Sequence, residues 1–144
     1  MTVKIRRFIP GDIDSIVEIL KVNGQYDYPN VEGPEAMKRV AICDAAIFLV
    51  AEKDKKTIGC IRATYDGSRA MIHLLSVHPE YRHRGVGANL VETIIKTLKA
   101  RGVPTISVTV TNSSKGFWDK LGFAELPVFL MLKNLGNYPL TPSN

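Results

Sequence analysis

Cysteine and long apolar runs are both scarce in this sequence. Its 144 residues include only Cys43 and Cys60, which do not form a Cys-x-x-Cys pair. We therefore expect two reduced thiols and neither a disulfide framework nor a zinc site. The longest apolar stretch, around residues 45–51, is far shorter than the ~20 residues that cross a bilayer, and no apolar signal region follows the charged residues 1–7. A cytoplasmic protein without a membrane segment is the expectation.

Several catalytic and nucleotide-binding motifs are also missing. The chain has no Gly-Lys-Ser or Gly-Lys-Thr, which the ATP-binding P-loop requires, and no Gly-x-Ser-x-Gly turn for a nucleophilic serine. Its three histidines, His73, His78 and His83, recur every five residues. An odd step along a strand reverses the face on which a side chain lies, so His73 and His78 are not expected to share a metal ion. We predict neither covalent catalysis nor a metal site.

Positive charge is in excess. Nineteen Lys and Arg residues against fourteen Asp and Glu residues give a formal net charge of +5 and an isoelectric point near 9.3. This balance favours an anionic partner. The basic residues cluster at one glycine turn and on scattered helix faces, and they do not alternate with aromatic residues as in single-strand binders. A nucleic-acid partner is therefore not expected.

The length and the periodicity of apolar residues predict one compact α+β domain over residues 1–144. With 45% apolar and 23% charged residues, the chain can bury a substantial core. Alternation predicts strands and three- to four-residue spacing predicts helices. The expected order is strand 4–8, a helix from 12 to about 23, an exposed loop 25–33, helix 34–43, strands 47–51, 57–64 and 70–77, helix 87–101, strand 105–110, helix 113–121, and one or two strands over 123–133. Asp12 is predicted to cap the first helix.

The most informative stretch joins the strand ending at Val77 to the long helix after Gly87. It contains Arg82, His83, Arg84, Gly85, Val86, Gly87 and Ala88. Glycines at a helix entrance allow close backbone approach, and the first N–H groups of the helix point outward at the positive end of its dipole. Two arginines add cationic forks, and no acidic residue precedes Glu92 in the helix. The stretch predicts a phosphate-binding turn. A dinucleotide fingerprint is excluded because its third glycine would fall on Leu90.

This turn resembles the Arg/Gln-x-x-Gly-x-Gly/Ala loop of the GCN5-related N-acetyltransferase (GNAT) family, which binds the pyrophosphate of acyl-coenzyme A. Residues 116–123, Gly-Phe-Trp-Asp-Lys-Leu-Gly-Phe, resemble a later motif of that family more loosely. The resemblance covers roughly residues 3–133. It implies a single-domain fold with a mixed, mostly antiparallel, twisted sheet of six to seven strands and about four helices.

The resemblance also implies acetyl-coenzyme A as co-substrate. Its pantetheine arm would lie in a V-shaped gap between strands 70–77 and 105–110, and the N–H of Leu75 would stabilise the oxyanion formed on the thioester. The implied cofactor-binding residues are Leu75, Val77, Arg82, His83, Arg84, Gly85, Val86, Gly87, Ala88, Asn112, Phe117 and Lys120. Phe117 could equally anchor its short helix, and Lys120 could equally be a solvated residue.

His73 is the candidate general base, with Leu75 as the other catalytic position. An imidazole accepts a proton near neutral pH, and alternation predicts that His73 and Leu75 lie on one face of their strand. The pattern His73-x-Leu75-x-Val77-His78 is similar to that of arylalkylamine-type acetyltransferases. The glutamate that other members carry as a base earlier on this strand is missing. Trp118 occupies the position of the tyrosine that commonly protonates the leaving thiolate in the family, so the identity of the general acid is left open.

The function expected is acetyl transfer from acetyl-coenzyme A to an amine, by direct attack in a ternary complex. The acceptor would be a small-molecule amine or a protein amine, with loop 25–33 and its residues Tyr26, Tyr28 and Glu32 as a wall of the acceptor site. Asp27 and Glu32 would attract a cationic amine. The alternative is a coenzyme A-binding regulatory module without turnover. Members of this family often dimerise, so the resemblance also allows a homodimer.

Overall fold

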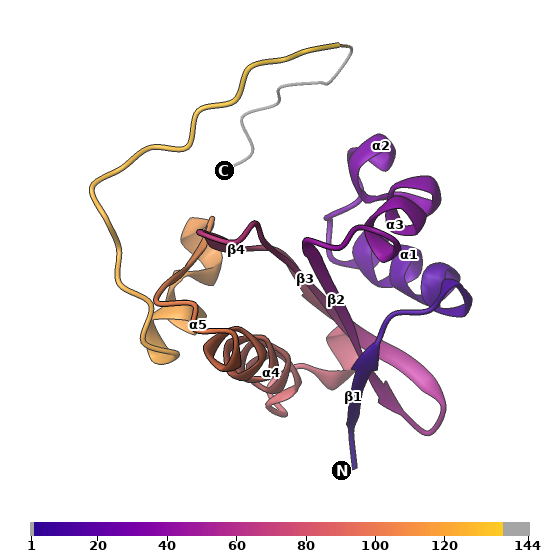
Figure 1. Cartoon of the computed structure of the whole chain (residues 1–144). Helices are drawn as coiled ribbons and strands as arrows, with labels where there is room; N and C mark the ends of the chain where they lie inside the picture. The colour runs from indigo at the N-terminus through magenta and orange to yellow at the C-terminus, as the bar shows by residue number, and fades with distance from the viewer. Residues whose placement is uncertain (1, 137–144) are drawn as a thin grey trace. The chain divides into compact units, whose positions relative to one another are not determined.

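The computed structural model describes residues 2–136. The chain divides into two compact units, the first ending at Ser107 and the second beginning at Val108. The elements up to this boundary are β1 (Lys4–Arg7), η1 (Pro10–Asp12), α1 (Ile13–Val22), α2 (Pro29–Glu32), α3 (Pro34–Ala41), β2 (Ala46–Lys53), β3 (Lys56–Tyr65), β4 (Ala70–Val77), η2 (Pro79–Tyr81) and α4 (Val86–Ala100) (Figure 1). Strand β5 (Ile106–Val108) crosses the boundary, and η3 (Asn112–Ser114) and α5 (Lys115–Lys120) belong to the second unit.

The five strands form one sheet in the order β1-β2-β3-β4-β5. Strands β1 to β4 pair antiparallel. The turn between β2 and β3 has Asp54 and Lys55 at φ of 51° and 64°, and the turn before β4 has Gly67 at φ of 100°. These left-handed conformations suit tight hairpins, as the sequence predicted. Helix α4 connects β4 to β5, a crossover typical of parallel neighbours, so the sheet is mixed.

The predicted number of strands is wrong, because the described residues form five strands and not six to seven. Residues 123–133 contain no strand. Their apolar run has the composition of a strand, but a strand also needs a hydrogen-bonded neighbour, and Pro127 provides no N–H. The large apolar side chains of this segment, from Leu126 to Leu135, are exposed. Residues 2–136 contain five α-helices, four of them longer than four residues, in agreement with the expected number of about four.

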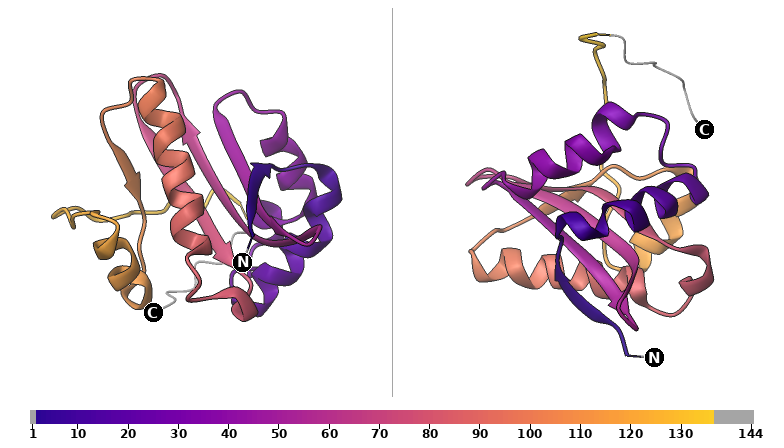
Figure 2. Two further views of the ribbon diagram at one scale, coloured as in Figure 1. Left: turned by 90° about the horizontal axis from the view of Figure 1, so that it is seen from below. Right: turned by 90° about the vertical axis from the view of Figure 1, so that its right-hand side faces the viewer.

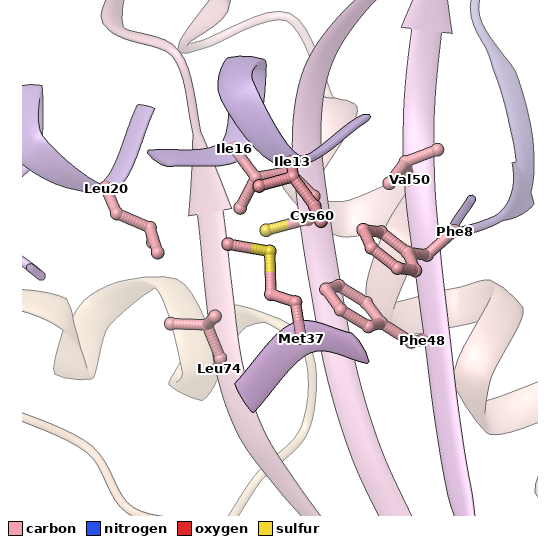
Figure 3. Packing of buried hydrophobic residues seen from close by; sticks show 9 residues of the cluster. All are labelled: Phe8, Ile13, Ile16, Leu20, Met37, Phe48, Val50, Cys60 and Leu74. Carbon is pink, nitrogen blue, oxygen red and sulfur yellow. The ribbon is translucent and has the colours of Figure 1, made fainter. Parts of the chain in front are cut away.

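Helices cover both faces of the sheet. Helices α1 and α3 lie on one face and α4 on the other (Figure 2). The core under α1 and α3 is a cluster of nine buried residues, shown in Figure 3: Phe8, Ile13, Ile16, Leu20, Met37, Phe48, Val50, Cys60 and Leu74. The rings of Phe8 and Phe48 stack with centroids 4.3 Å apart, which links β1 to β2 across this core.

On the opposite face, α4 buries Leu90, Val91 and Ile94 completely, as its apolar stripe predicts. Gly59 on β3 makes this close packing possible. A Cβ at Gly59 would lie 3.1 Å from the carbonyl oxygen of Ser76 and 3.5 Å from Cδ1 of Leu90. The missing side chain therefore lets the first turns of α4 approach the middle of the sheet, and so fixes where the entrance of α4 lies.

Asp12 has a different role from the predicted cap of α1. No side-chain hydrogen bond caps that helix. Asp12 instead accepts hydrogen bonds from the guanidinium of Arg6, the backbone N–H of Ile9 and the hydroxyl of Thr57, at 2.8–2.9 Å. Burial acts to raise the pKa of Asp12, but these hydrogen bonds outweigh it and hold the pKa below its usual value. The buried carboxylate thus joins β1, the start of α1 and β3.

Both cysteines are free, as predicted: Cys43 is exposed and Cys60 is buried. Burial raises the pKa of the Cys60 thiol to about 12, which keeps it protonated and unreactive at neutral pH. Within residues 2–136, no helix combines the length and the hydrophobicity that a membrane span requires.

Candidate active site

The turn that leads into α4 has the backbone conformation expected of a phosphate-binding loop. Gly85, the N-cap of α4, has φ of 80° and ψ of 7°, and His83 has φ of 62°. Both values lie in the left-handed region, which a residue with a side chain adopts only at a cost. Gly85 adopts it freely because it has no Cβ, and space around the missing Cβ is open. The chain can therefore enter α4 with its backbone exposed.

The first amides of α4 are available to an anion. The N–H groups of Val86, Gly87 and Ala88 occupy the first helical turn, where no intrahelical carbonyl can accept them. No side chain caps this end, and the first turn carries no acidic residue. The helix is 15 residues long, so its dipole adds positive potential at this end. The residues present fit a diphosphate group, which needs several convergent N–H donors and no nearby carboxylate.

Two arginines, Arg82 and Arg84, precede these amides in the sequence. Arg84 lies over the ring of Tyr81, with Cζ 5.7 Å from the ring centroid, and Arg82 donates a hydrogen bond from Nη2 to Oδ1 of Asn23. Both arginines and His83 are exposed. Both arginines are therefore accessible from solvent in the turn that leads into α4, and guanidinium groups can add charge-assisted hydrogen bonds to an anion.

Strand β4 directly precedes this turn in the sequence. The N–H of His78 donates to the carbonyl of Ile58 at 2.8 Å, which fixes the hydrogen-bonded positions between β3 and β4. Leu75 and Val77 fall on the alternate positions, so their N–H and C=O groups point away from β3, toward the side of β4 on which the three-residue strand β5 lies; this side is called the outer edge of β4. Asn23 Nδ2 donates to the carbonyl of Val77 at 2.9 Å, and Gln25 Nε2 donates to that of Leu75 at 3.3 Å.

A β-bulge in β4 overturns one prediction about His73. Opposite β3, Arg62 pairs with Leu74 and Ala63 pairs with Ile72, so His73 is an extra residue without a partner. The bulge breaks the simple alternation on which the prediction relied. His73 therefore lies on the face covered by α1 and α3, whereas the side chain of Leu75 lies on the face covered by α4.

The ring of His73 is held by β3. Its Nε2 lies 2.7 Å from Oγ1 of Thr64. Packing around the ring, followed by the positive charge of Arg62, lowers the pKa of His73 below its usual value of 6.5. His73 is thus neutral at neutral pH and can accept a proton.

His73 also lines a cavity of about 240 Å³. Its other lining residues are Val40, Cys43, Ala46, Arg62 and Thr64. Two of the polar groups here come from β3 and one from β4, while α3 and the start of β2 provide the apolar wall. A small molecule in this cavity would lie beside the imidazole, on the face of the sheet opposite α4.

The predicted acceptor wall, residues 25–33, is not an open loop throughout. It includes the helical turn α2, and Glu32 at its end turns inward, with Oε2 3.5 Å from Nη2 of Arg62. Burial raises the pKa of Glu32, and the charge of Arg62 opposes this effect. Asp27 remains exposed. Glu32 therefore neutralises Arg62 beside the cavity, a role that the sequence pattern did not indicate.

The remaining predicted cofactor residues belong to the second unit. Asn112 and Lys120 are exposed there and Phe117 is half-buried. Trp118 is buried, and the rings of Phe117 and Phe123 meet it edge-on with centroids 5.1 Å away. Trp118 is thus an anchor of α5. The cofactor roles of Asn112, Phe117 and Lys120 stay predictions.

The family model of the acetyltransferase (GNAT) family matches residues 14–123 of the sequence. This chain belongs to the GNAT acetyltransferase family. The match spans nearly all of α1, the whole of β2 to β4, the glycine turn and α5. The resemblance found in Arg82–Gly87 is thereby confirmed.

Several solved structures share this fold. A PaiA N-acetyltransferase from Thermoplasma acidophilum, solved in complex with coenzyme A, matches with a TM-score of 0.81 and 21% identity over 90% of this chain and 94% of that one. A transcriptional regulator from Bacillus halodurans C-125 matches with 0.78 and 26% identity over 92% and 100%. Glucosamine-6-phosphate N-acetyltransferase from Arabidopsis thaliana matches with 0.73 and 18% identity over 94% and 100%.

Three polar residues near the GNAT glycine turn were not singled out by sequence reasoning. Asn23 was interpreted only as the end of a helix, and Gln25 only as the start of a loop. Ser76 was treated as part of a strand. Ser76 lies two residues after Leu74 on β4, so alternation places it on the same buried face of the sheet. A buried hydroxyl needs hydrogen-bond partners, but no pattern in the sequence identifies them.

Proposed function

We propose that this GNAT protein is an acetyl-coenzyme A-dependent N-acetyltransferase that acts on an amine by direct attack in a ternary complex. One observation supports this most: the uncapped amides of Val86, Gly87 and Ala88, at an acid-free helix entrance preceded in the sequence by Arg82 and Arg84. Such an arrangement suits the diphosphate of coenzyme A, and the net charge of +5 favours an anionic co-substrate.

The pantetheine arm would run along the outer edge of β4. The outward N–H groups of Leu75 and Val77 support this placement, because carbonyls of an amide-containing chain can accept from them, while the carbonyls of the same two residues already accept from Gln25 and Asn23. The N–H of Leu75 would then stabilise the negative charge on the thioester oxygen, a contribution often worth about 3 kcal/mol.

Proton removal is the step for which this chain offers His73. An alkyl amine with a pKa near 10.4 is only about one part in 2,500 neutral at pH 7, yet attack requires the neutral form. In the reaction, a C–N bond forms, the C–S bond breaks, and the electron pair leaves on sulfur. His73, neutral at neutral pH, would take the proton of the amine, directly or through water, and the thiolate can leave without an acid.

The acceptor amine would enter the cavity beside His73. Arg62 stands in this cavity but is paired with Glu32, so a cationic amine is not repelled by an uncompensated charge. The apolar residues Val40 and Ala46 would contact the carbon skeleton of the acceptor. A small primary amine with an apolar substituent fits these features.

A coenzyme A-binding regulatory module is the second candidate. It is favoured by Trp118, which cannot donate the proton that a tyrosine would, and one similar structure is named a transcriptional regulator. This candidate predicts binding of acetyl-coenzyme A without turnover, whereas the enzyme predicts both.

The two candidates are separated by measuring thiol release from acetyl-coenzyme A in the presence of a panel of alkyl and arylalkyl amines, together with the affinity for coenzyme A by calorimetry. We expect release of thiol that depends on the acceptor and exceeds the hydrolysis seen without amine. Binding of acetyl-coenzyme A with no acceptor-dependent thiol across the panel would favour the module instead. Absence of binding would reject both.

A further inference from the structure

A chain of hydrogen bonds joins the glycine turn to the edge of β4 through the end of α1. Arg82 Nη2 donates to Asn23 Oδ1. The amide nitrogen of Asn23 donates to Oγ of Ser76 at 2.7 Å and to the carbonyl of Val77 at 2.9 Å. Ser76 in turn donates to Oε1 of Gln25 at 2.6 Å. Side chains from three separate segments thus meet at one amide.

The backbone at the end of α1 directs Asn23 and Gln25 onto β4. Asn23 is the C-cap, and Gly24 follows in the left-handed conformation with φ of 69°. The N–H of Gln25 then donates back to the carbonyl of Leu20 at 2.8 Å, and that of Gly24 to the carbonyl of Lys21 at 3.2 Å. This is a Schellman ending, which gives the residues after the helix a fixed direction. Asn23 is therefore placed by the backbone and not by a flexible loop.

The partners of Asn23 decide which way its amide points. The carbonyl of Val77 can only accept, and Ser76 uses its own proton on Gln25, so both need the NH₂ of Asn23 as donor. Ser76 is 3% exposed, and leaving its hydroxyl without this donor would be costly. The oxygen of the Asn23 amide is consequently turned toward Arg82. A neutral oxygen holds the guanidinium in place while leaving its full positive charge for an anion.

From this geometry we infer that Asn23 is a positioning residue, which holds Arg82 beside the glycine turn before the diphosphate of coenzyme A binds. The inference rests on the proposed function. Arg82 is exposed and has several rotatable bonds. Without Asn23, its side chain would lose conformational entropy when coenzyme A binds, and this loss would weaken binding. Asn23 touches no part of the co-substrate in this account and acts only through Arg82.

A double-mutant cycle with Arg82 tests the inference, with the dissociation constant of coenzyme A measured by calorimetry. We expect Asn23→Ala alone to raise Kd about 5- to 10-fold, and Arg82→Ala alone to raise it more. In the Arg82→Ala background, Asn23→Ala should change Kd less than 2-fold, because the group that it positions is gone. Val22→Ala, at an exposed position one residue away, is the matched control and should leave Kd unchanged.

A purely structural role of Asn23 gives a different result. It would lower the melting temperature and raise Kd by the same factor with and without Arg82, and this additivity would overturn the inference. So would an unchanged Kd in Asn23→Ala. If Asn23→Ala does not fold, Asn23→Gln replaces it: it keeps an NH₂ donor for Ser76 and Val77 but displaces the oxygen that accepts from Arg82, so Kd should still rise in the wild-type background and change less than 2-fold in Arg82→Ala. Wild-type protein that binds no coenzyme A would instead reject the proposed function itself.

Discussion

Replacing Gly85 by glutamate should raise the dissociation constant of coenzyme A about 100-fold or more. Two effects add. A side chain at φ of 80° costs about 1–2 kcal/mol, which is relieved only if the turn changes shape. A carboxylate beside the first amides of α4 would also compete for the N–H groups that the diphosphate needs, and losing one charge-assisted hydrogen bond costs about 1.5–3 kcal/mol. Together, at about 2.5–5 kcal/mol, these correspond to about two to four powers of ten in affinity.

Gly102 provides a matched control at the opposite end of the same helix. It also has φ of 80°, with open space around its missing Cβ. Gly102→Glu therefore introduces the same backbone strain and the same charge, but far from the amides of Val86 to Ala88. We expect it to lower stability about as much as Gly85→Glu and to leave the affinity for coenzyme A within about 2-fold. Equal losses of affinity in the two variants would show that the loss comes from reduced stability of the fold and not from disturbed binding of the diphosphate.

His73→Gln should reduce kcat about 100-fold or more while the affinity for coenzyme A stays within a few-fold. General base catalysis typically contributes factors of 10² to 10⁴, and glutamine cannot accept the proton of the amine. The unprotonated imidazole is the active form, so the activity of the wild-type protein should fall as pH drops through the pKa of His73. That pKa lies below 6.5, and the variant should lack this acidic limb. Steady-state kinetics between pH 5 and 8 on the best amine checks both points.

His78→Gln is the control for the change of residue type. His78 Nδ1 accepts a hydrogen bond from the N–H of Glu80 at 3.2 Å, which caps η2 after the end of β4. Glutamine should keep kcat and the pH profile close to those of the wild type. A His73→Gln variant that retains more than about one third of kcat, with the acidic limb intact, would exclude His73 as the base.

Much of this fold was predictable because its elements have strong local signals. The bounds of β4, Ala70–Val77, agree with the sequence prediction, and α4 differs from it by about one residue at each end. Both have clear periodicity and clear stop signals. The glycine turn was predictable for the same reason, since two glycines and two arginines at a helix entrance depend on local geometry only.

The features that were missed depend on contacts between distant residues. The bulge at His73 is one extra residue in an otherwise regular strand, and nothing in its composition marks where the register slips. Asn23 and Arg82 are 59 residues apart in the sequence, and their contact exists only because α1 ends against β4. The apolar run after Leu126 shows the reverse error, because strand-like composition alone does not supply a pairing partner.

The central claim is that the first amides of α4 bind the diphosphate of coenzyme A. The most direct measurement follows the backbone ¹⁵N–¹H resonances of the protein by NMR during titration with coenzyme A and, separately, with pantetheine, which lacks the diphosphate. We predict that coenzyme A produces large shifts at Val86, Gly87 and Ala88, and that pantetheine does not shift them. Saturable binding of coenzyme A that leaves these three resonances in place would contradict the claim.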